Sequence, residues 1–261
     1  MSDLITSMQN PKVRLLQTLQ QKSSERRRQG LFVVEGRREV ERCIANGYEV
    51  DTVFCCPEIF GGHWTGQGRV VDVSPAVYDK LAYRGGTEGI VAEVKVRERR
   101  LDMLSLSASP LLVVLESVEK PGNLGAVLRS ADAAGVDAVI VCDPLTDLYN
   151  PNLIRSSTGA FFSVPCVACS SADCIRFLKE RDIQILTAQL QDSSLYYDVD
   201  MCRGTAIVMG TEATGLTPQW RQAADAQIRI PMLGCADSLN VSVSAAILMY
   251  EAVRQRHSSA H

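Results

Sequence analysis

Apolar and polar positions follow two alternating patterns along the second half of the chain. Five short runs there are strand candidates, and several of them are continuously apolar: residues 111–117, 138–143, 183–189, 205–210 and 226–232. Such runs are typical of strands that are buried on both faces of a parallel sheet. Segments with helical periodicity separate them, such as residues 123–135, which end at a glycine. The pattern predicts an α/β domain with a largely parallel sheet.

The first part of the chain alternates in the same way over shorter elements. Strands are predicted, with helices between them, at residues 31–36, 50–56 and 89–96. A charged and then short polar stretch follows at residues 97–110 and ends in a proline. We therefore predict three parts, which are a small α/β domain at 1–98, a linker at 99–110 and a second domain at 111–261.

Charge is distributed unevenly between the two predicted domains. The chain of 261 residues has a net charge of −3. Residues 1–100 contain 16 Lys and Arg against 13 Asp and Glu, which leaves 11 against 17 in the remainder. The first domain is therefore the better candidate for contacts with phosphate. Its densest basic cluster consists of Lys22, Arg26, Arg27, Arg28, Arg37 and Arg38.

Several classes of protein do not fit the sequence. No run of about 18 apolar residues predicts a membrane-spanning helix, and no charged segment followed by an apolar core predicts a secretory signal. The nine irregularly spaced cysteines are typical of reduced thiols. We therefore expect a cytoplasmic protein without a membrane partner.

Common catalytic and cofactor motifs are also missing from the sequence. Neither the dinucleotide-binding G-x-G-x-x-G motif nor a P-loop occurs. Two of the three histidines lie at the C-terminal end, so a Ser-His-Asp or Cys-His arrangement would depend on His63 alone. Cys166 and Cys169 form a single C-x-x-C pair, without the second pair or nearby histidine that a zinc site needs. We predict small thiols on a strand there and no metal site.

Polar residues follow three of the predicted strands, where ligands bind in open α/β sheets. Each set has a purely structural explanation as well: a helix cap, an exposed helix charge or a glycine-rich turn. The loop at 237–240 has more polar groups than one helix cap requires, which is the first indication of a site. The residues are Asn123 and Arg129, then Thr211 and Glu212 between Gly210 and Gly215, then Asp237, Ser238 and Asn240.

Three blocks of sequence carry a strong resemblance to a known family. They are ESVEKPGNLGAVLRSADAAGVDAVIV at 116–141, IVMGTEATGL at 207–216 and IRIPMLGCADSLNVSVSAAILMYEA at 228–252. In this order they resemble the three motifs of the SpoU/TrmH family of RNA ribose 2′-O-methyltransferases, within the SPOUT superfamily. The first domain resembles the RNA-binding domain, similar to a ribosomal protein, that many members carry.

The resemblance implies a fold, a cofactor and partners. The second domain would be an α/β knot, in which the last segment of a mostly parallel sheet is threaded into a trefoil knot. S-adenosylmethionine would bind in the knot and donate its methyl group to a ribose hydroxyl of rRNA or tRNA. The apolar last helix would pack against a second subunit in a homodimer. The basic cluster of the first domain would bind the RNA.

Site residues follow from the resemblance at matching positions. The implied cofactor-binding residues are Met209, Gly210, Thr211, Ile230, Met232 and Leu239. The implied catalytic residues are Asn123, Arg129, Glu212, Ser238 and Asn240. Arg129 would stabilise the developing alkoxide or bind the neighbouring phosphate, because a guanidinium stays protonated. Asn123 would connect Arg129 to the substrate, Glu212 would orient them, and Ser238 and Asn240 would hold the loop and the ribose.

Two other functions stay open from the sequence. One is methylation of a base nitrogen in tRNA, as other SPOUT enzymes perform. The other is a non-catalytic RNA-binding or ribosome-assembly role on the same scaffold. Asn123 and Arg129, with Ser238 and Asn240, favour ribose methylation. The RNA and the nucleotide cannot be assigned from the sequence.

Overall fold

The computed structural model describes residues 4–82, 88–211 and 214–258, which form two compact units. Unit 1 comprises Met1–Glu98 and Tyr149–Ser163, and unit 2 comprises Arg99–Leu148 and Val164–His261. The segment 149–163 was predicted to lie in the second domain but packs with the first. Its aromatic side chains explain this, because Phe162 lies against Phe32 and Tyr48.

Unit 1 is built on a four-stranded sheet. Its order is β1 (Leu31–Glu35), β4 (Ile90–Lys95), β2 (Val50–Cys55) and β3 (Arg69–Asp72). β4 runs antiparallel to β1 and β2, and β3 runs parallel to β2. The predictions of β1, β2 and β4 are confirmed, whereas the four-residue β3 was not predicted.

Helices complete unit 1. They are α1 (Pro11–Gln21), α2 (Ser23–Gln29), α3 (Arg37–Ala45), α4 (Pro57–Phe60), α5 (Pro75–Leu81), α7 (Pro151–Ser156) and α8 (Ala160–Ser163). The buried face of α1, with Val13, Leu16 and Leu19, shares a core with α5 and the sheet. The three residues are spaced by three positions, as a helix packed on one face requires.

Unit 2 contains a seven-stranded sheet in which every described pair of neighbouring strands is parallel. Its order is β7 (Cys166–Cys169), β6 (Ala138–Cys142), β5 (Leu111–Glu116), β10 (Thr205–Met209), β8 (Gln184–Ala188), β11 (Ala226–Arg229) and β9 (Ser194–Leu195). This confirms the predicted α/β class with a parallel sheet. The trefoil knot stays a prediction from the family resemblance.

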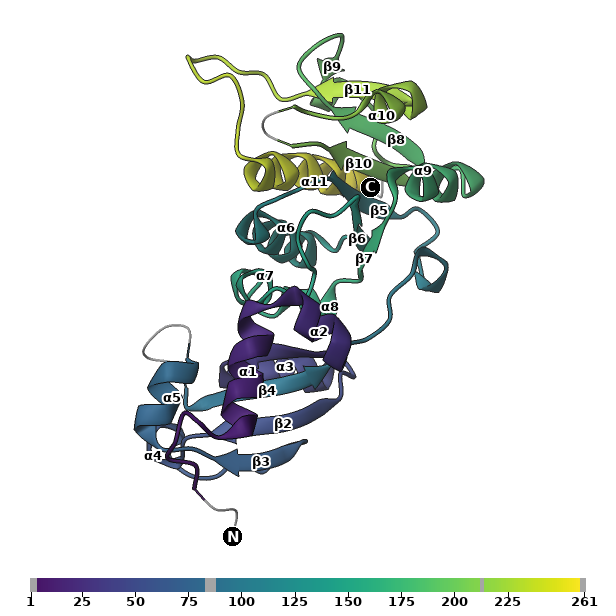
Figure 1. Ribbon diagram of the computed structural model, residues 1–261. Coiled ribbons are helices and arrows are strands. Elements are labelled where there is room, and N and C mark those ends of the chain that lie inside the picture. Colours follow the sequence, from purple (N-terminus) through teal and green to yellow (C-terminus); the bar gives the residue numbers. More distant parts are fainter. Residues whose placement is uncertain (1–3, 83–87, 212–213, 259–261) are drawn as a thin grey trace. The chain divides into compact units, whose positions relative to one another are not determined.

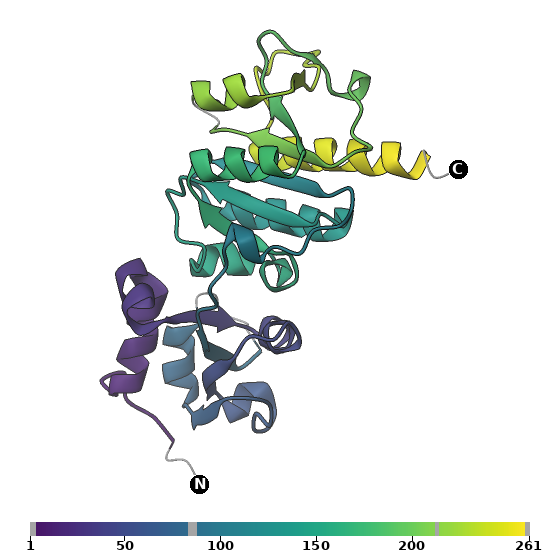
Figure 2. The ribbon, with the colours of Figure 1, turned by 90° about the vertical axis from the view of Figure 1, so that its right-hand side faces the viewer.

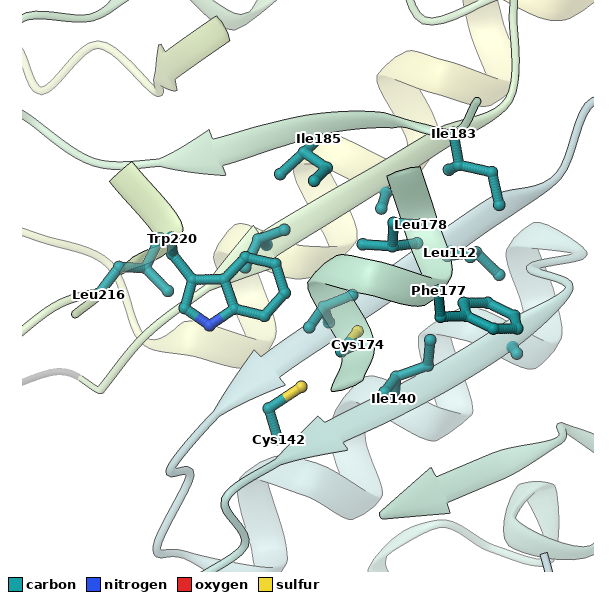
Figure 3. Close-up of a cluster of buried hydrophobic side chains, with 14 residues drawn as sticks. Leu112, Ile140, Cys142, Cys174, Phe177, Leu178, Ile183, Ile185, Leu216 and Trp220 are labelled. Atoms are coloured by element: carbon teal, nitrogen blue, oxygen red, sulfur yellow. The ribbon is translucent and has the colours of Figure 1, made fainter. Parts of the chain in front are cut away.

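Helices pack against this sheet from two sides (Figure 1). α9 (Ser171–Glu180) and α10 (Pro218–Ala223) cover the face that carries Leu112, Ile140 and Val208, and Figure 3 shows this core around Trp220. α6 (Pro121–Ala134) packs against α11 (Val241–Ser258), which contacts β5 and β10. In Figure 2, α11 is the yellow helix that leads to the C-terminal end. Two short 3₁₀ helices lie at Leu101–Met103 and Tyr196–Asp198.

None of the helices in the described part of the chain has the length and apolar character needed to cross a membrane.

Candidate active site

Three loops of unit 2 come together at one place. β5 and β10 are adjacent and parallel, so the loops that follow them, at 117–120 and 210–217, leave the same edge of the sheet side by side. The third loop, at 230–240, connects β11 to α11, and α11 packs along α6. The beginning of α11 is thereby brought to the first two loops. The sequence placed site residues in the second and third of these loops and on α6, the helix that follows the first.

α6 carries the first two predicted residues. The helix begins at Pro121, whose fixed φ suits the first helical position, and Lys120 is its N-cap residue. Asn123 therefore lies inside the first turn, where its backbone N–H donates to the Lys120 carbonyl at 3.0 Å. A helix cap, the purely structural explanation available for Asn123 from the sequence, is therefore ruled out, because the helix begins two residues earlier.

Arg129 lies on the same helix, about 9 Å further along its axis. Its side chain is exposed, and it makes no hydrogen bond or ion pair to the residues that the structure describes. It also lies outside the linings of the two cavities described below. The geometry of one chain therefore leaves this guanidinium accessible to a ligand.

The loop after β10 is closed by its threonines. Thr211 Oγ1 lies 2.8 Å from Thr214 Oγ1 and accepts the Thr214 N–H at 3.0 Å. The Thr211 carbonyl accepts the Gly215 N–H at 3.0 Å, and Gly215 has a φ of +67°. A left-handed φ favours glycine, which explains its presence at this turn. Glu212, predicted to be catalytic, lies outside the described residues.

Gly210 is needed for a close approach of two backbone segments. A Cβ atom at Gly210 would lie 2.3 Å from the carbonyl carbon of Gly215 and 2.5 Å from the nitrogen of Leu216. Both contacts are with backbone, which cannot rotate away as a side chain can. Any larger residue at this position would displace the loop.

Glu116, which was not among the predicted site residues, holds this loop through Thr217. It ends β5 with a side chain that is only 2% exposed. Its carboxylate accepts the Thr217 N–H at 2.8 Å and the Thr217 hydroxyl at 2.6 Å. A third donor is the Ser171 hydroxyl at 3.3 Å. A carboxylate at the end of an otherwise apolar strand was the signal that could have revealed it.

Asn240, at the end of the third loop, connects that loop with the first turn of α6. Its side-chain oxygen accepts the Ser242 N–H at 3.0 Å and so caps α11. Its side-chain nitrogen donates to Asn123 Oδ1 at 3.2 Å. The surplus of polar groups before this apolar helix is thus partly explained, because one amide serves as the cap and as a link to α6.

A cavity of about 410 Å³ lies between the second and third loops. Four of the six predicted cofactor residues line it, together with Ser238: Met209, Gly210, Thr211 and Leu239. Ile230 and Met232 are half-buried and are not part of its lining. The chain between β11 and α11 extends away from the sheet (Figure 1), and Leu233 within it is 97% exposed.

A second cavity of about 160 Å³ adjoins the first. Asn123, Glu119 and Lys120 contribute to its lining, so it has both an amide and charges of either sign. The two cavities share Gly210, Thr211 and Val241. The structure therefore provides two adjoining places for small groups, separated by the backbone at the end of β10.

The predicted basic cluster lies in unit 1, and one of its six residues, Arg26, is buried. Arg26 is only 3% exposed, and its guanidinium donates to the Leu19 carbonyl at 2.6 Å, near the end of α1. The prediction that Arg26 binds RNA was therefore wrong: its side chain is buried and holds the end of α1. The remaining five, Lys22, Arg27, Arg28, Arg37 and Arg38, are exposed. Arg28 pairs with Glu25, and Arg37 pairs with Glu41.

Two family models match the chain. The SpoU rRNA Methylase family matches residues 110–250, and the MRM3-like substrate binding domain matches residues 10–92. The first match includes all three loops of the site. The second includes most of the sheet of unit 1.

Known proteins resemble the chain over most of its length. It is 30% identical to a 23S rRNA (uridine(2479)-2′-O)-methyltransferase of Streptomyces viridochromogenes, over 97% of this chain and 92% of that protein. It is 39% identical to the 23S rRNA (guanosine-2′-O-)-methyltransferase RlmB of Bordetella pertussis, over 72% of this chain and 79% of RlmB.

A solved structure of a SpoU methyltransferase has a similar fold over almost the whole chain. The SpoU methyltransferase AviRb from Streptomyces viridochromogenes, in complex with the cofactor AdoMet, superposes with a TM-score of 0.87 at 29% identity. The superposition covers 96% of this chain and 99% of AviRb.

Proposed function

Because the chain belongs to the SpoU rRNA Methylase family, we propose that it transfers a methyl group from S-adenosylmethionine to a ribose 2′-hydroxyl of ribosomal RNA. One observation carries this proposal: three loops meet at two adjoining cavities that share Gly210, Thr211 and Val241. Transfer between two bound molecules requires that both be held next to each other, in line and in contact.

The larger cavity fits the cofactor. Its volume of about 410 Å³ lies within the usual range for small-molecule sites, about 300 to 1,000 Å³. Leu239 and Met209 supply apolar surface, and Gly210 and Gly215, which also line the cavity, supply backbone hydrogen-bonding groups. Apolar walls with backbone hydrogen-bonding groups suit an adenosine. When bound, S-adenosylmethionine supplies an electrophilic methyl group, and Met209, Gly210, Thr211 and Leu239 would hold it.

The smaller cavity is assigned to the ribose. The hydroxyl is the weaker reactant, and it must lose or share its proton as the new bond forms. Asn123 lines this cavity, and Asn240 fixes its orientation through the 3.2 Å hydrogen bond. The Asn123 amide would hold a ribose hydroxyl, and Asn240, which is not part of the cavity lining, would keep Asn123 in place.

Arg129 is proposed to stabilise the negative charge that develops on the substrate or to bind the adjacent phosphate. It is exposed and makes no ion pair within the described part of the chain, so its charge is available. A guanidinium does not lose its proton near neutral pH, which argues for this role over that of a base. Ser238, on the wall of the cofactor cavity, and Glu212 are proposed to complete the site.

Unit 1 is proposed to bind the RNA. Residues 10–92 match a substrate-binding domain, and the exposed basic residues of α2 and α3 lie within that range. Lys22, Arg27 and Arg38 are not engaged in ion pairs with described residues. Such cations attract phosphate without reading sequence.

The two methyltransferases compared by sequence above are named for 23S rRNA, and we propose the same RNA for this chain, with the reaction in the cytoplasm. One relative is named for uridine and the other for guanosine. The nucleotide therefore has to be found by experiment. Ribosomal RNA from a strain that lacks the protein should be incubated with the protein and methyl-labelled S-adenosylmethionine. Nucleoside analysis should then yield a labelled 2′-O-methylnucleoside.

The same experiment separates the alternatives. A label on a base nitrogen of tRNA would replace ribose methylation. No labelled nucleoside from either RNA would favour a non-catalytic role.

A homodimer through α11 is also proposed. Part of one face of this helix is apolar and not fully covered within the chain. Val243 and Tyr250 are 47% and 50% exposed, and Ile247 between them is half-buried. These positions are spaced by three and four residues and therefore share a face. A second copy that covers this face would also rest on a helix whose first turn is joined to the site through Asn240.

A further inference from the structure

Three cysteine thiols from separate segments of unit 2 meet outside the site described above. Cys142 is the last residue of β6, Cys169 is the last residue of β7, and Cys174 lies on α9. The three Sγ atoms all lie within 4.8 Å of one another. The Sγ atoms of Cys142 and Cys169 are 4.0 Å apart.

The sheet explains why these three meet. Cys142 and Cys169 are directly paired in the register of β6 and β7, so their side chains lie next to each other on one face. α9 covers that face and brings Cys174 to it, and Figure 3 shows Cys174 beside Cys142 in the core. Cys166 is three residues before Cys169 on the same strand, and its side chain therefore points to the opposite face. The cluster therefore does not include both cysteines of the C-x-x-C pair, because Cys166 faces away from it.

We propose that Cys142, Cys169 and Cys174 form a trithiolate site for one thiophilic metal ion of the Zn²⁺ type. Zinc binds thiolate sulfur at about 2.3 Å, so two sulfurs of a tetrahedral zinc site lie about 3.8 Å apart. The observed separation of 4.0 Å between two of the sulfurs is close to this value. On binding, three Zn–S bonds form, the three thiol protons pass to the solvent, and the hydrated ion gives up water ligands.

A helix N-terminus lies beside one of the three thiols, and a cavity gives the ion a path. Cys174 lies in the first turns of α9, a ten-residue helix whose N-terminus favours negative charge. Cys142 and Cys174 are fully buried, whereas Cys169 is half-buried and lines a cavity of about 570 Å³. Asp173 and Arg176 line the same cavity. An ion could therefore enter beside Cys169, and a water or an external ligand could fill its fourth position.

The site would join three elements that also support the methyltransferase loops. Ser171, the first residue of α9, donates to Asp143 at 2.6 Å and to Glu116 at 3.3 Å. Glu116 in turn holds Thr217. A bound ion would therefore fix α9 to β6 and β7 next to this hydrogen-bond network, which gives it a structural role.

The experiment uses the full chain with Cys202 and Cys235 replaced by serine, because these are the half-buried and exposed thiols outside the cluster. The protein is stripped with a chelator under reducing conditions and titrated with Zn²⁺ against a chromophoric competitor. We expect one equivalent to bind, with a rise in melting temperature. Cd²⁺ should give a sulfur-to-metal charge-transfer band.

Single variants test the ligands. Cys142→Ser, Cys169→Ser and Cys174→Ser should each weaken Zn²⁺ binding at least tenfold, whereas Cys166→Ser, which alters a buried thiol on the same strand, should bind as the parent does. Circular dichroism and S-adenosylmethionine binding check that each variant is folded. Equal Zn²⁺ binding by the parent and the triple Cys142/Cys169/Cys174 serine variant would overturn the proposal. So would a disulfide between Cys142 and Cys169 in protein purified without reductant.

Discussion

The side-chain nitrogen of Asn240 donates a hydrogen bond to the side-chain oxygen of Asn123 across 3.2 Å, although 117 positions separate the two residues. The oxygen of the same Asn240 amide caps α11 through the Ser242 N–H. One side chain thus couples the start of the last helix to the first turn of α6. Stability and activity can be separated by changing the two ends of this amide independently.

Asn240→Asp should keep the cap and lose the link. A carboxylate is a good N-cap, but it cannot donate to Asn123. We expect the parent's melting temperature and a loss of single-turnover methyl transfer of up to about 10-fold, the scale of one lost hydrogen bond. Asn240→Ala is the control, and it should lose activity together with about 1 kcal/mol of stability. Unchanged turnover by Asn240→Asp would show that the link is dispensable.

Arg129→Ala should slow methyl transfer strongly without weakening the binding of S-adenosylmethionine. Its guanidinium lies outside the cavity lined by Met209, Gly210 and Leu239, so S-adenosylmethionine affinity should match the parent. Loss of one charge-stabilising group should slow the single-turnover rate by about 100- to 1,000-fold. Calorimetry and rapid-quench measurements on the true RNA check the two expectations. Parent-like turnover would remove Arg129 from the mechanism.

RNA affinity should depend on the exposed basic residues of unit 1. Arg27→Glu combined with Arg38→Glu should weaken RNA binding and flatten its dependence on salt, because fewer counterions are released. Cofactor affinity should not change. Filter binding from low to moderate salt measures the RNA affinity of the variant and of the parent. Equal affinities would place the RNA site elsewhere.

Arg26→Ala is the matched comparison from the same helix. Arg26 is buried and bonds to the Leu19 carbonyl, so its loss should lower stability by about 1 to 3 kcal/mol. The RNA affinity of the folded protein should remain near that of the parent. A large loss of RNA affinity in the folded variant would restore Arg26 to the RNA site.

The proposed dimer should depend on the half-covered face of α11. Ile247→Glu places a charge beside Val243 and Tyr250 and should lower the dimer content and the activity together. Met249 has no exposed surface, so Met249→Glu should instead unfold the domain. Sedimentation at low micromolar concentration measures the oligomeric state. A fully active monomeric parent would refute both the dimer and its coupling to the site.

Glu93 should make the protein less stable as the pH rises. Burial, assisted by the nearby charge of Asp51, raises the pKa of this β4 carboxyl to about 7. The folded chain therefore holds the proton more tightly than the unfolded chain does. Stability should fall as the pH rises from about 4.5 to about 7, because the ionised carboxylate is poorly solvated where it is buried.

Glu93→Gln removes this titration while keeping the shape of the side chain. It should be more stable than the parent at pH 8, by up to about 3 kcal/mol, and the difference should shrink towards pH 4.5. Thermal unfolding of both proteins across this range is the measurement. A constant difference at all pH values would contradict a titrating Glu93.

The sequence by itself determined the elements whose character is local. The apolar runs that became β5, β6, β8, β10 and β11 carry the signature of buried parallel strands in consecutive residues, so neighbours along the chain suffice to identify them. The polar loops after β5, β10 and β11 could be related to one another because parallel strands end at one edge of a sheet. The family motifs lie in these loops.

Only the tertiary structure decided which residues meet. The link between Asn240 and Asn123, the burial of Arg26 and the support of Thr217 by Glu116 all depend on packing between segments far apart in the chain. Packing likewise joined residues 149–163 to the first unit. The cysteine cluster shows the reason most clearly: strand register paired Cys142 with Cys169, and strand alternation turned Cys166 away. Register is set by contacts along a whole sheet, so no local spacing of cysteines reveals it.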